Sequence, residues 1–381
     1  MLRADRAVHD NGAMSAPDIS PIDAWLQEIW DRGASDLLLT TWAPPLARVD
    51  GALVRLDAAP IKPRELERLV DTVLGDELAE RFHHDKEVDF SFGWGTDARF
   101  RANAFHQRGS VALALRLIPK QIPSFDDLGL PQAARDLVSL PQGLVLVTGP
   151  TGSGKSTTLA AMIEAINRGR ACHIITIEDP IEYLYDHGRS AVNQRELGTD
   201  TTSFERALRS VLREDPDVLL VGEMRDIETI AATLTIAETG HLVFATLHTN
   251  DAAQTLDRVV DVFPAEQQAQ IRVQLAASLE AVVSQRLLPR IGGGRVAAFE
   301  VLLANHAIRN LIRDGRTNQL RNQIVTGARE GMQTLEMSLT ELVAAGLVDH
   351  DEAVAHTLHP NEVRRTGGPV QPTPTSAPRV R

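Results

Sequence analysis

Hydrophobic positions along the chain follow two different patterns, one on each side of residue 120. In the first part, short runs that alternate apolar and polar residues stand between stretches with apolar residues three and four apart, which predicts an α+β domain. The predicted helices of this part are 22–32, 63–74 and 76–82, and its predicted strands are 37–40, 47–49, 53–56, 88–94, 99–107 and 111–118.

The second part, from about residue 131, alternates continuous apolar runs with helical stretches. This alternation predicts a parallel sheet flanked by helices. From Glu266 to about His356 the pattern predicts a helical region, interrupted by three glycines (292–294) and a short strand at 296–302. The strands and helices predicted before it are 143–148, 156–168, 172–178, 204–213, 217–222, 227–239, 241–247 and 252–262.

These patterns predict an α/β fold class and a plan of domains. Compact sequence begins near residue 21, so Met1 and Met14 remain alternative starts of the protein. A proline-containing stretch is expected to be a linker, and the polar N-terminus and the Pro- and Thr-rich end are expected to be disordered. The predicted segments are a disordered N-terminus (1–20), an α+β domain (21–118), the linker (119–130), an α/β domain (131–304), a helical C-terminal region (305–357) and a disordered tail (358–381).

A glycine-rich segment joins the first predicted strand of the second part to the helix after it. The segment matches the pattern G-x-x-x-x-G-K-[ST] in the strand–loop–helix context that this phosphate-binding motif requires. Backbone N–H groups of such a loop and the helix N-terminus can bind phosphate oxygens. Lys155 can contact the β- and γ-phosphates and Ser156 can bind Mg²⁺, so we expect ATP and Mg²⁺ as ligands. The segment is Gly149, Pro150, Thr151, Gly152, Ser153, Gly154, Lys155 and Ser156, followed by Thr157.

Acidic residues follow two more of the predicted strands. Glu178, Asp179 and Glu182 follow one strand, and Glu223 ends the next. Ligands of an open α/β sheet lie beyond the carboxyl ends of its strands, so we expect these carboxylates near the phosphates. There a carboxylate can deprotonate the attacking water or take part in the Mg²⁺ shell. The alternatives are solvated acids at a helix start for the first group and an ordinary strand end for Glu223.

Histidines and arginines supply further candidates. His241 and His248 bracket a predicted strand, and His248, at its carboxyl end, is placed to sense the γ-phosphate. Too few ligands accompany them for a zinc site, and buried, hydrogen-bonded histidines are the alternative. Arginines supplied from elsewhere can neutralise charge on the γ-phosphate, with a surface role as the alternative. In the first domain the candidates are Arg99, Arg101 and Arg116.

Composition limits the classes of function. The chain has 381 residues and a net charge of −12, whereas a nucleic-acid-binding protein is usually basic. Its one cysteine, Cys172, cannot form an internal disulfide or a four-cysteine zinc site. No apolar run approaches the roughly 18 residues that span a bilayer, and the first residues lack the apolar core of a signal peptide. We therefore expect a cytoplasmic protein that does not bind nucleic acid and does not span the membrane.

Four motifs together resemble the type II/type IV secretion ATPase superfamily. They are GPTGSGKSTT (its phosphate loop), TIEDPIEYL (its Asp box), LREDPDVLLVGEMRD (its Walker B segment) and ETGHLVFATLHTND (its His box), followed by DRVVDVFP. AIRNLIRDGR (307–316) and GMQTLEMSL (331–339) are similar to segments of its pilus-retraction branch. The resemblance covers about residues 22–350. The family pattern has a histidine at Leu38 and often an arginine at Gln142, so these two positions depart from it.

This resemblance implies a hexameric ring of identical subunits, each with a PAS-like N-terminal domain and a RecA-like P-loop ATPase domain. Lys155 and Ser156 would bind phosphate and Mg²⁺, Glu182 would be the catalytic base, and Glu223 would act in the Mg²⁺ and water shell. The two histidines, His241 and His248, would couple the nucleotide state to domain motion. The three arginines of the first domain lie in or after RFRANAFHQ, which resembles the segment that supplies arginines to a neighbouring subunit.

The resemblance further implies ATP-driven retraction of a type IV pilus, with the inner-membrane platform protein of the pilus machine as partner, at the inner face of the cytoplasmic membrane. Helical spacing places Ile308, Leu311 and Ile312 on one stripe and Arg309 and Arg313 on another face, which is expected to be free for a partner. A solvated basic face is the alternative. Alternative functions are a pilus assembly or type II secretion ATPase and, in a different class, a nucleic-acid motor.

Overall fold

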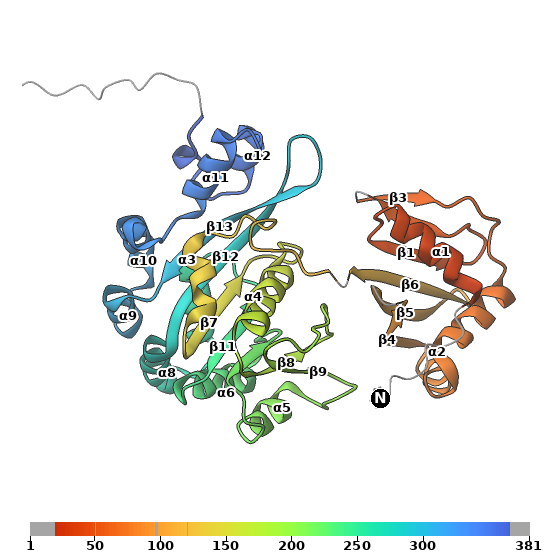
Figure 1. Cartoon of the computed structure of the whole chain (residues 1–381), viewed down its shortest axis with the longest axis horizontal. Helices are drawn as coiled ribbons and strands as arrows, with labels where there is room; N and C mark the ends of the chain where they lie inside the picture. Colours follow the sequence, from red (N-terminus) through yellow and green to blue (C-terminus); the bar gives the residue numbers. More distant parts are fainter. Residues whose placement is uncertain (1–19, 50, 96–97, 120, 366–381) are drawn as a thin grey trace, which may run out of the picture. The chain divides into compact units, whose positions relative to one another are not determined.

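The computed structural model describes residues 20–49, 51–95, 98–119 and 121–365 (Figure 1). These residues form two compact units that divide between Gln121 and Ile122. The predicted disordered ends lie outside the described residues, apart from Ser20 and residues 358–365. The predicted tail starts too early, because Val363 is buried and Glu362 forms an ion pair of 2.5 Å with Arg321.

The first unit is a six-stranded antiparallel sheet in the order β3-β2-β1-β6-β5-β4, covered by two helices. Apolar side chains of the helices, such as Leu26 and Phe82, are buried with those of the strands in one core. The second helix includes both predicted helices and changes direction at Gly75, whose φ of 68° is not helical. The elements are α1 (Ser20–Asp31), β1 (Asp36–Thr40), β2 (Leu46–Val49), β3 (Ala52–Arg55), α2 (Pro63–Asp85), β4 (Glu87–Trp94), β5 (Ala98–Gln107) and β6 (Ser110–Pro119).

The second unit is built on a seven-stranded sheet in the order β13-β12-β7-β11-β10-β8-β9. All neighbours are parallel except β13, which is antiparallel to β12. The strands are β7 (Gly143–Thr148), β8 (His173–Glu178), β9 (Ala191–Glu196), β10 (Val218–Val221), β11 (Leu242–Leu247), β12 (Leu279–Pro289) and β13 (Arg295–Leu303). The predicted α/β fold is confirmed.

Helices cover both faces of this sheet (Figure 1). Leu144 and Leu146 of β7 belong to the core on one face, while Val145 and Val147 belong to the core on the other. Burial on both faces explains why the strand is a continuous apolar run. The α-helices are α3 (Gln132–Asp136), α4 (Lys155–Gly169), α5 (Phe204–Val211), α6 (Ile227–Glu238), α7 (Ala252–Asp261), α8 (Ala265–Ser278), α9 (His306–Arg313), α10 (Leu320–Thr326), α11 (Leu335–Ala344) and α12 (His350–Ala355). Short 3₁₀ turns are η1 (Leu137–Ser139), η2 (Thr317–Gln319), η3 (Gly327–Glu330) and η4 (Pro360–Glu362).

Two strands of this sheet were not predicted. Residues 279–289, expected within a helical region, form β12, which pairs with β7 on one side and β13 on the other. Most of its residues are buried, so its sequence shows no alternation, and periodicity alone does not distinguish a buried strand from a buried helix. Edge strand β9 carries the polar sequence AVNQRE and pairs only with β8 among the described strands.

Candidate nucleotide-binding site

Four adjacent parallel strands end at one edge of the second sheet. In the order β7, β11, β10 and β8, they lead into the glycine-rich loop, His248, Glu223 and Glu178. Their register is direct: Thr148 lies opposite Leu247, and Val221 lies opposite both Ala245 and Ile177. Because parallel strands align their carboxyl ends, residues from four separate motifs meet beside the loop.

The loop requires glycine where it approaches β12. Gly149 has φ of 141°, and a Cβ there would lie 2.3 Å from the backbone oxygen of Gln285. Gly154 has φ of 89°, and a Cβ there would lie 2.9 Å from Nε2 of the same residue. Gln285 Oε1 also accepts a hydrogen bond of 2.8 Å from Thr158 of α4. The unpredicted strand β12 therefore shapes the loop and anchors the first turn of α4.

Lys155 and Ser153 are polar groups of the loop that can still bind a ligand. The Lys155 ammonium donates to the backbone oxygens of Gly149 (2.8 Å) and Pro150 (3.1 Å). Burial lowers the pKa of Lys155, while the charges of Glu223 and Glu182 oppose that shift. The hydroxyl of Ser153 is buried without a hydrogen-bond partner among the described residues. A phosphate group fits this arrangement, because it would give Ser153 an acceptor and Lys155 a counter-charge.

The other polar side chains of the loop and of the first turn of α4 face the same edge. Thr151 Oγ1 lies 3.4 Å from His248 Nδ1, and Thr157 Oγ1 lies 3.0 Å from the hydroxyl of Tyr183. Ser156 is half-buried in this turn, where a hydroxyl next to the phosphate-binding lysine is suited to Mg²⁺. Tyr183 was not among the predicted site residues.

The acidic group after β8 has one buried member, Glu178, and two exposed members, Asp179 and Glu182. Glu178 is buried, and burial raises its pKa to about 7. Its carboxylate accepts hydrogen bonds from Thr176 (2.6 Å), from Gln194 (3.3 Å) and from the backbone N–H of Glu182 (3.4 Å). The side chain of Glu182 is exposed. Glu178 thus holds the backbone of this segment, and the carboxylates of Asp179 and Glu182 are open to solvent.

Glu223 lies between an arginine and a histidine. Its carboxylate is 2.7 Å from Arg225 and 3.3 Å from His248 Nε2. Burial raises the pKa of Glu223, but the hydrogen bond from Arg225 and the charges of His248 and Arg225 outweigh it, so the pKa is lowered overall. Arg225 also lies 3.8 Å from Asp179. Glu223 therefore stays ionised, and Arg225, to which no role was assigned from the sequence, links both acidic segments.

His248 connects the acidic residues to the loop. Its Nε2 faces Glu223, while its Nδ1 lies 3.4 Å from both Lys155 Nζ and Thr151 Oγ1. One imidazole thus contacts the phosphate-binding lysine and the carboxylate expected in the Mg²⁺ shell. This geometry suits the predicted role of His248 in sensing the γ-phosphate.

Comparisons with known proteins identify the family of this chain. The family model described as "Type II/IV secretion system protein" matches residues 12–293. The chain belongs to this family. It is 51% identical over 322 residues to the type IV pilus retractation ATPase PilT of Pseudomonas aeruginosa, covering 84% of this chain and 94% of that protein. It is 50% identical over 310 residues to a twitching motility protein of Neisseria gonorrhoeae, covering 81% of this chain and 83% of that protein.

A solved structure extends the similarity to three dimensions. The crystal structure of the pilus retraction motor PilT with bound ADP superimposes with a TM-score of 0.84 at 50% identity, covering 90% of this chain and 98% of that one. The resemblance to the secretion ATPase superfamily is therefore confirmed. Within the described part of this family member, every helix is too short or too polar to cross a membrane.

In this secretion-family chain, His241 lies away from the site. It directly precedes the amino end of β11. Its Nδ1 is 3.1 Å from both Thr239 Oγ1 and the backbone oxygen of Ile236. The six residues of β11 place it about 20 Å from His248. Gln142 precedes β7 at the same distant end. Of the two histidines, the structure brings His248 to the loop.

The three arginines of the first unit lie on two neighbouring strands. Arg101 of β5 is the register partner of Arg116 of β6. Arg116 donates a hydrogen bond of 2.9 Å to Asp36, and Arg99 donates to Ser91. Arg101 and Arg116 are exposed. Their supply to a neighbouring subunit stays a prediction.

The prediction of a free arginine face on α9 is wrong for Arg309. Ile308 and Ile312 are buried as expected, but Arg309 donates to the backbone oxygens of Ala276 (2.8 Å) and Ala277 (2.9 Å) and pairs with Glu280 at 2.8 Å. It thereby caps the carboxyl end of α8, whose last carbonyl groups need donors. Arg313 is exposed and donates only to Asn310 among the described residues.

Proposed function

We propose that this chain hydrolyses ATP to power the retraction of a type IV pilus. The observation that carries the proposal is the joint placement of Lys155, Glu223 and His248 at one sheet edge, in a chain that matches a pilus retractation ATPase over 94% of that protein's length. The prediction of a pilus-retraction ATPase is confirmed by these relatives.

Each residue of the site has a proposed role in hydrolysis. Lys155 would exchange the loop carbonyls for phosphate oxygens, and Ser156 and Glu223 would hold Mg²⁺. When bound, Mg²⁺ would neutralise charge on the phosphates. Glu182, exposed beside the site, removes a proton from the attacking water. His248 detects the state of the γ-phosphate, because it contacts both Lys155 and Glu223.

We further propose an assembly and a location for the motor. Identical subunits form a hexameric ring, and Arg99, Arg101 and Arg116 of one subunit stabilise charge in the site of its neighbour. The ring acts at the inner face of the cytoplasmic membrane, on the platform protein of the pilus machine. The names of the relatives as pilus retraction and twitching proteins support this assignment.

Complementation tests the proposed function. A Pseudomonas aeruginosa strain that lacks its own retractation ATPase is expected to regain twitching when it expresses this chain. Lys155→Ala is expected to abolish both nucleotide binding and rescue, whereas Glu182→Gln keeps ATP binding and loses hydrolysis by about 10²–10⁴-fold. Rescue by Lys155→Ala, or wild-type turnover of Glu182→Gln, would contradict the assigned roles. Nucleic-acid-stimulated ATP turnover without rescue would favour the nucleic-acid motor.

A further inference from the structure

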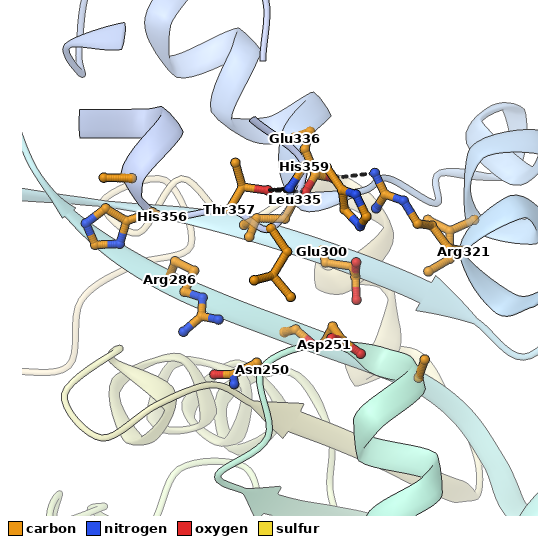
Figure 2. Close-up of a pocket in the computed structure, with 15 residues that line it drawn as sticks. Asn250, Asp251, Arg286, Glu300, Arg321, Leu335, Glu336, His356, Thr357 and His359 are labelled. Atoms are coloured by element: carbon orange, nitrogen blue, oxygen red, sulfur yellow. Dashed lines mark hydrogen bonds and ion pairs between the residues drawn. The ribbon is translucent and has the colours of Figure 1, made fainter. Parts of the chain in front are cut away.

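A second cavity lies in the second unit, between the sheet and the C-terminal helices (Figure 2). Its volume is 410 Å³, within the range of small-molecule sites. Strands β12 and β13 form one wall, the start of α7 forms another, and α10, α11 and residues 355–359 close it from the C-terminal side. No role in the proposed function uses this cavity.

Arg286 is the unsatisfied group of the cavity. Its Nε is buried without a hydrogen-bond partner, and the guanidinium makes no hydrogen bond or ion pair within the described ranges. Figure 2 shows the side chain extending from β12 toward Asn250. Burial lowers the pKa of Arg286, while the charges of Asp251 and Glu300 oppose that shift. An arginine stays charged at neutral pH, so this wall carries a positive charge with no direct partner.

The acidic groups of the cavity, in contrast, have partners. Asp251 accepts a hydrogen bond of 2.8 Å from the backbone of Gln254, and Glu300 accepts one of 2.7 Å from the backbone of Ala252. Glu336 pairs with Arg321 at 2.9 Å. Among these charged groups, the guanidinium of Arg286 is the one without a hydrogen-bond or ion-pair partner in the described part of the chain, and an anionic ligand would supply that partner. A guanidinium binds carboxylate and phosphate oxygens with two parallel hydrogen bonds.

The remaining lining indicates that the anion is part of a larger, partly apolar molecule. Ile324 of α10 and Leu335 of α11 line the cavity, and Leu358 lines it while 78% exposed. An exposed leucine at a cavity gives an apolar body a surface to contact. The cavity also faces away from α4: Gln285 bonds to that helix, and its neighbours Ser284 and Arg286, on the opposite face of β12, line the cavity.

We propose that this cavity binds a small organic anion, a carboxylate or phosphate ester with an apolar body, through the guanidinium of Arg286. The site is separate from the phosphate loop, so the anion and a nucleotide bind at the same time. The two probes are phenyl phosphate and benzoate, which share an apolar ring and differ in the anionic group.

Ligand-detected NMR titration of the full chain, with saturating ADP to occupy the phosphate loop, tests the proposal. We expect at least one probe to bind, and the tighter probe identifies the source as a phosphate ester or a carboxylate. Arg286→Gln is expected to weaken binding by about tenfold or more, because it removes charge-assisted hydrogen bonds. Arg290→Gln, at an exposed arginine after β12, is the matched control and is expected to bind as wild type.

A second variant keeps Arg286 and blocks the space. Ala355 is exposed and lines the cavity, so Ala355→Trp can fill it without disturbing the core, and binding is expected to be lost. Unchanged ADP affinity in Arg286→Gln and Ala355→Trp shows that both variants fold. Absence of binding by both probes, or wild-type binding in either variant, would overturn the proposal.

Discussion

Two buried carboxyl groups of the second unit have a raised pKa. Burial raises the pKa of Glu178 and of Glu300 to about 7, against an ordinary value of 4.5. Between pH 4.5 and about pH 7, the folded chain keeps a proton on each of these carboxyl groups, whereas the unfolded chain releases it. Stability therefore falls as pH rises from about 4.5 to about 7, and the full penalty is present above pH 7.

Replacing Glu300 by glutamine removes this penalty. The amide oxygen can still accept the hydrogen bond from Ala252, while the buried charge is gone. The unfolding free energy of Glu300→Gln relative to wild type is expected to increase between pH 5 and pH 8, by at most about 3 kcal/mol. Urea unfolding at both pH values measures it. The same shift in Glu341→Gln, an exposed residue of α11, or no shift in Glu300→Gln, would contradict the explanation.

Gln285 is the residue through which β12 supports the phosphate loop. Gln285→Leu leaves the buried hydroxyl of Thr158 without its acceptor, which costs about 1–3 kcal/mol. We expect ADP affinity to fall about tenfold, because the first turn of α4 loses its anchor. Adding Thr158→Val removes the unpaired hydroxyl and is expected to restore part of the affinity. Strictly additive losses, measured by calorimetry with ADP, would show that the two residues do not act as a pair.

At the scale of elements, the junction of α8 and α9 depends on one arginine. Arg309→Ala leaves two backbone oxygens of α8 and the carboxylate of Glu280 without their donor. The unfolding free energy is expected to fall by about 1–3 kcal/mol. Arg313→Ala, on the same helix, is expected to change it by less than about 0.5 kcal/mol, because its side chain is exposed.

Urea unfolding of both variants separates structural from functional roles in this segment. If Arg313→Ala leaves stability unchanged and still abolishes twitching, its exposed side chain meets a partner. Equal stability losses in the two variants would contradict the assignment of Arg309 as the cap of α8. If Arg309→Ala is less stable than wild type, a twitching defect in this variant does not show that Arg309 contacts a partner.

At the scale of the whole molecule, the proposed ring predicts rescue between two inactive variants. The Lys155→Ala subunit lacks its own phosphate site but keeps Arg101. The Arg101→Ala subunit keeps its phosphate site but lacks the arginine that its neighbour needs. In a mixed ring, an Arg101→Ala site beside a Lys155→Ala subunit is complete. Random mixing in equal amounts is expected to restore about one quarter of wild-type ATPase activity, because about one quarter of interfaces are complete.

Steady-state ATPase assays of the mixture measure this rescue. Lys155→Ala mixed with Glu182→Gln is the matched control, because both changes affect groups proposed to serve the same subunit's site. That mixture is expected to stay inactive. A mixture of Lys155→Ala with Arg101→Ala that shows only the average of its two components would remove Arg101 from the neighbouring site.

Much of the site was predictable because its motifs are local. The loop 149–156 combines glycines, a lysine and a serine at fixed spacing. The apolar residues on either side of it predicted β7 and α4. Glu223 and His248 end strands, and parallel strands align their carboxyl ends. Their position at one edge of the sheet could therefore be expected from the sequence, although the order of the strands could not. The same argument placed His248, at the carboxyl end of its predicted strand, near the phosphates, and put His241 at the other end.

The phosphate loop, the α/β class and the strand ends that carry the acidic residues could be predicted, because each depends on residues near one another in the chain. Other features depend on contacts between distant segments. Residues 279–289 became a strand because β7 and β13 pair with them, and Arg309 became a cap because α8 ends beside it. The raised pKa of Glu178 and the unpartnered Arg286 likewise arise from burial. Burial and long-range pairing depend on which distant segments pack together, and no local pattern in the chain encodes them.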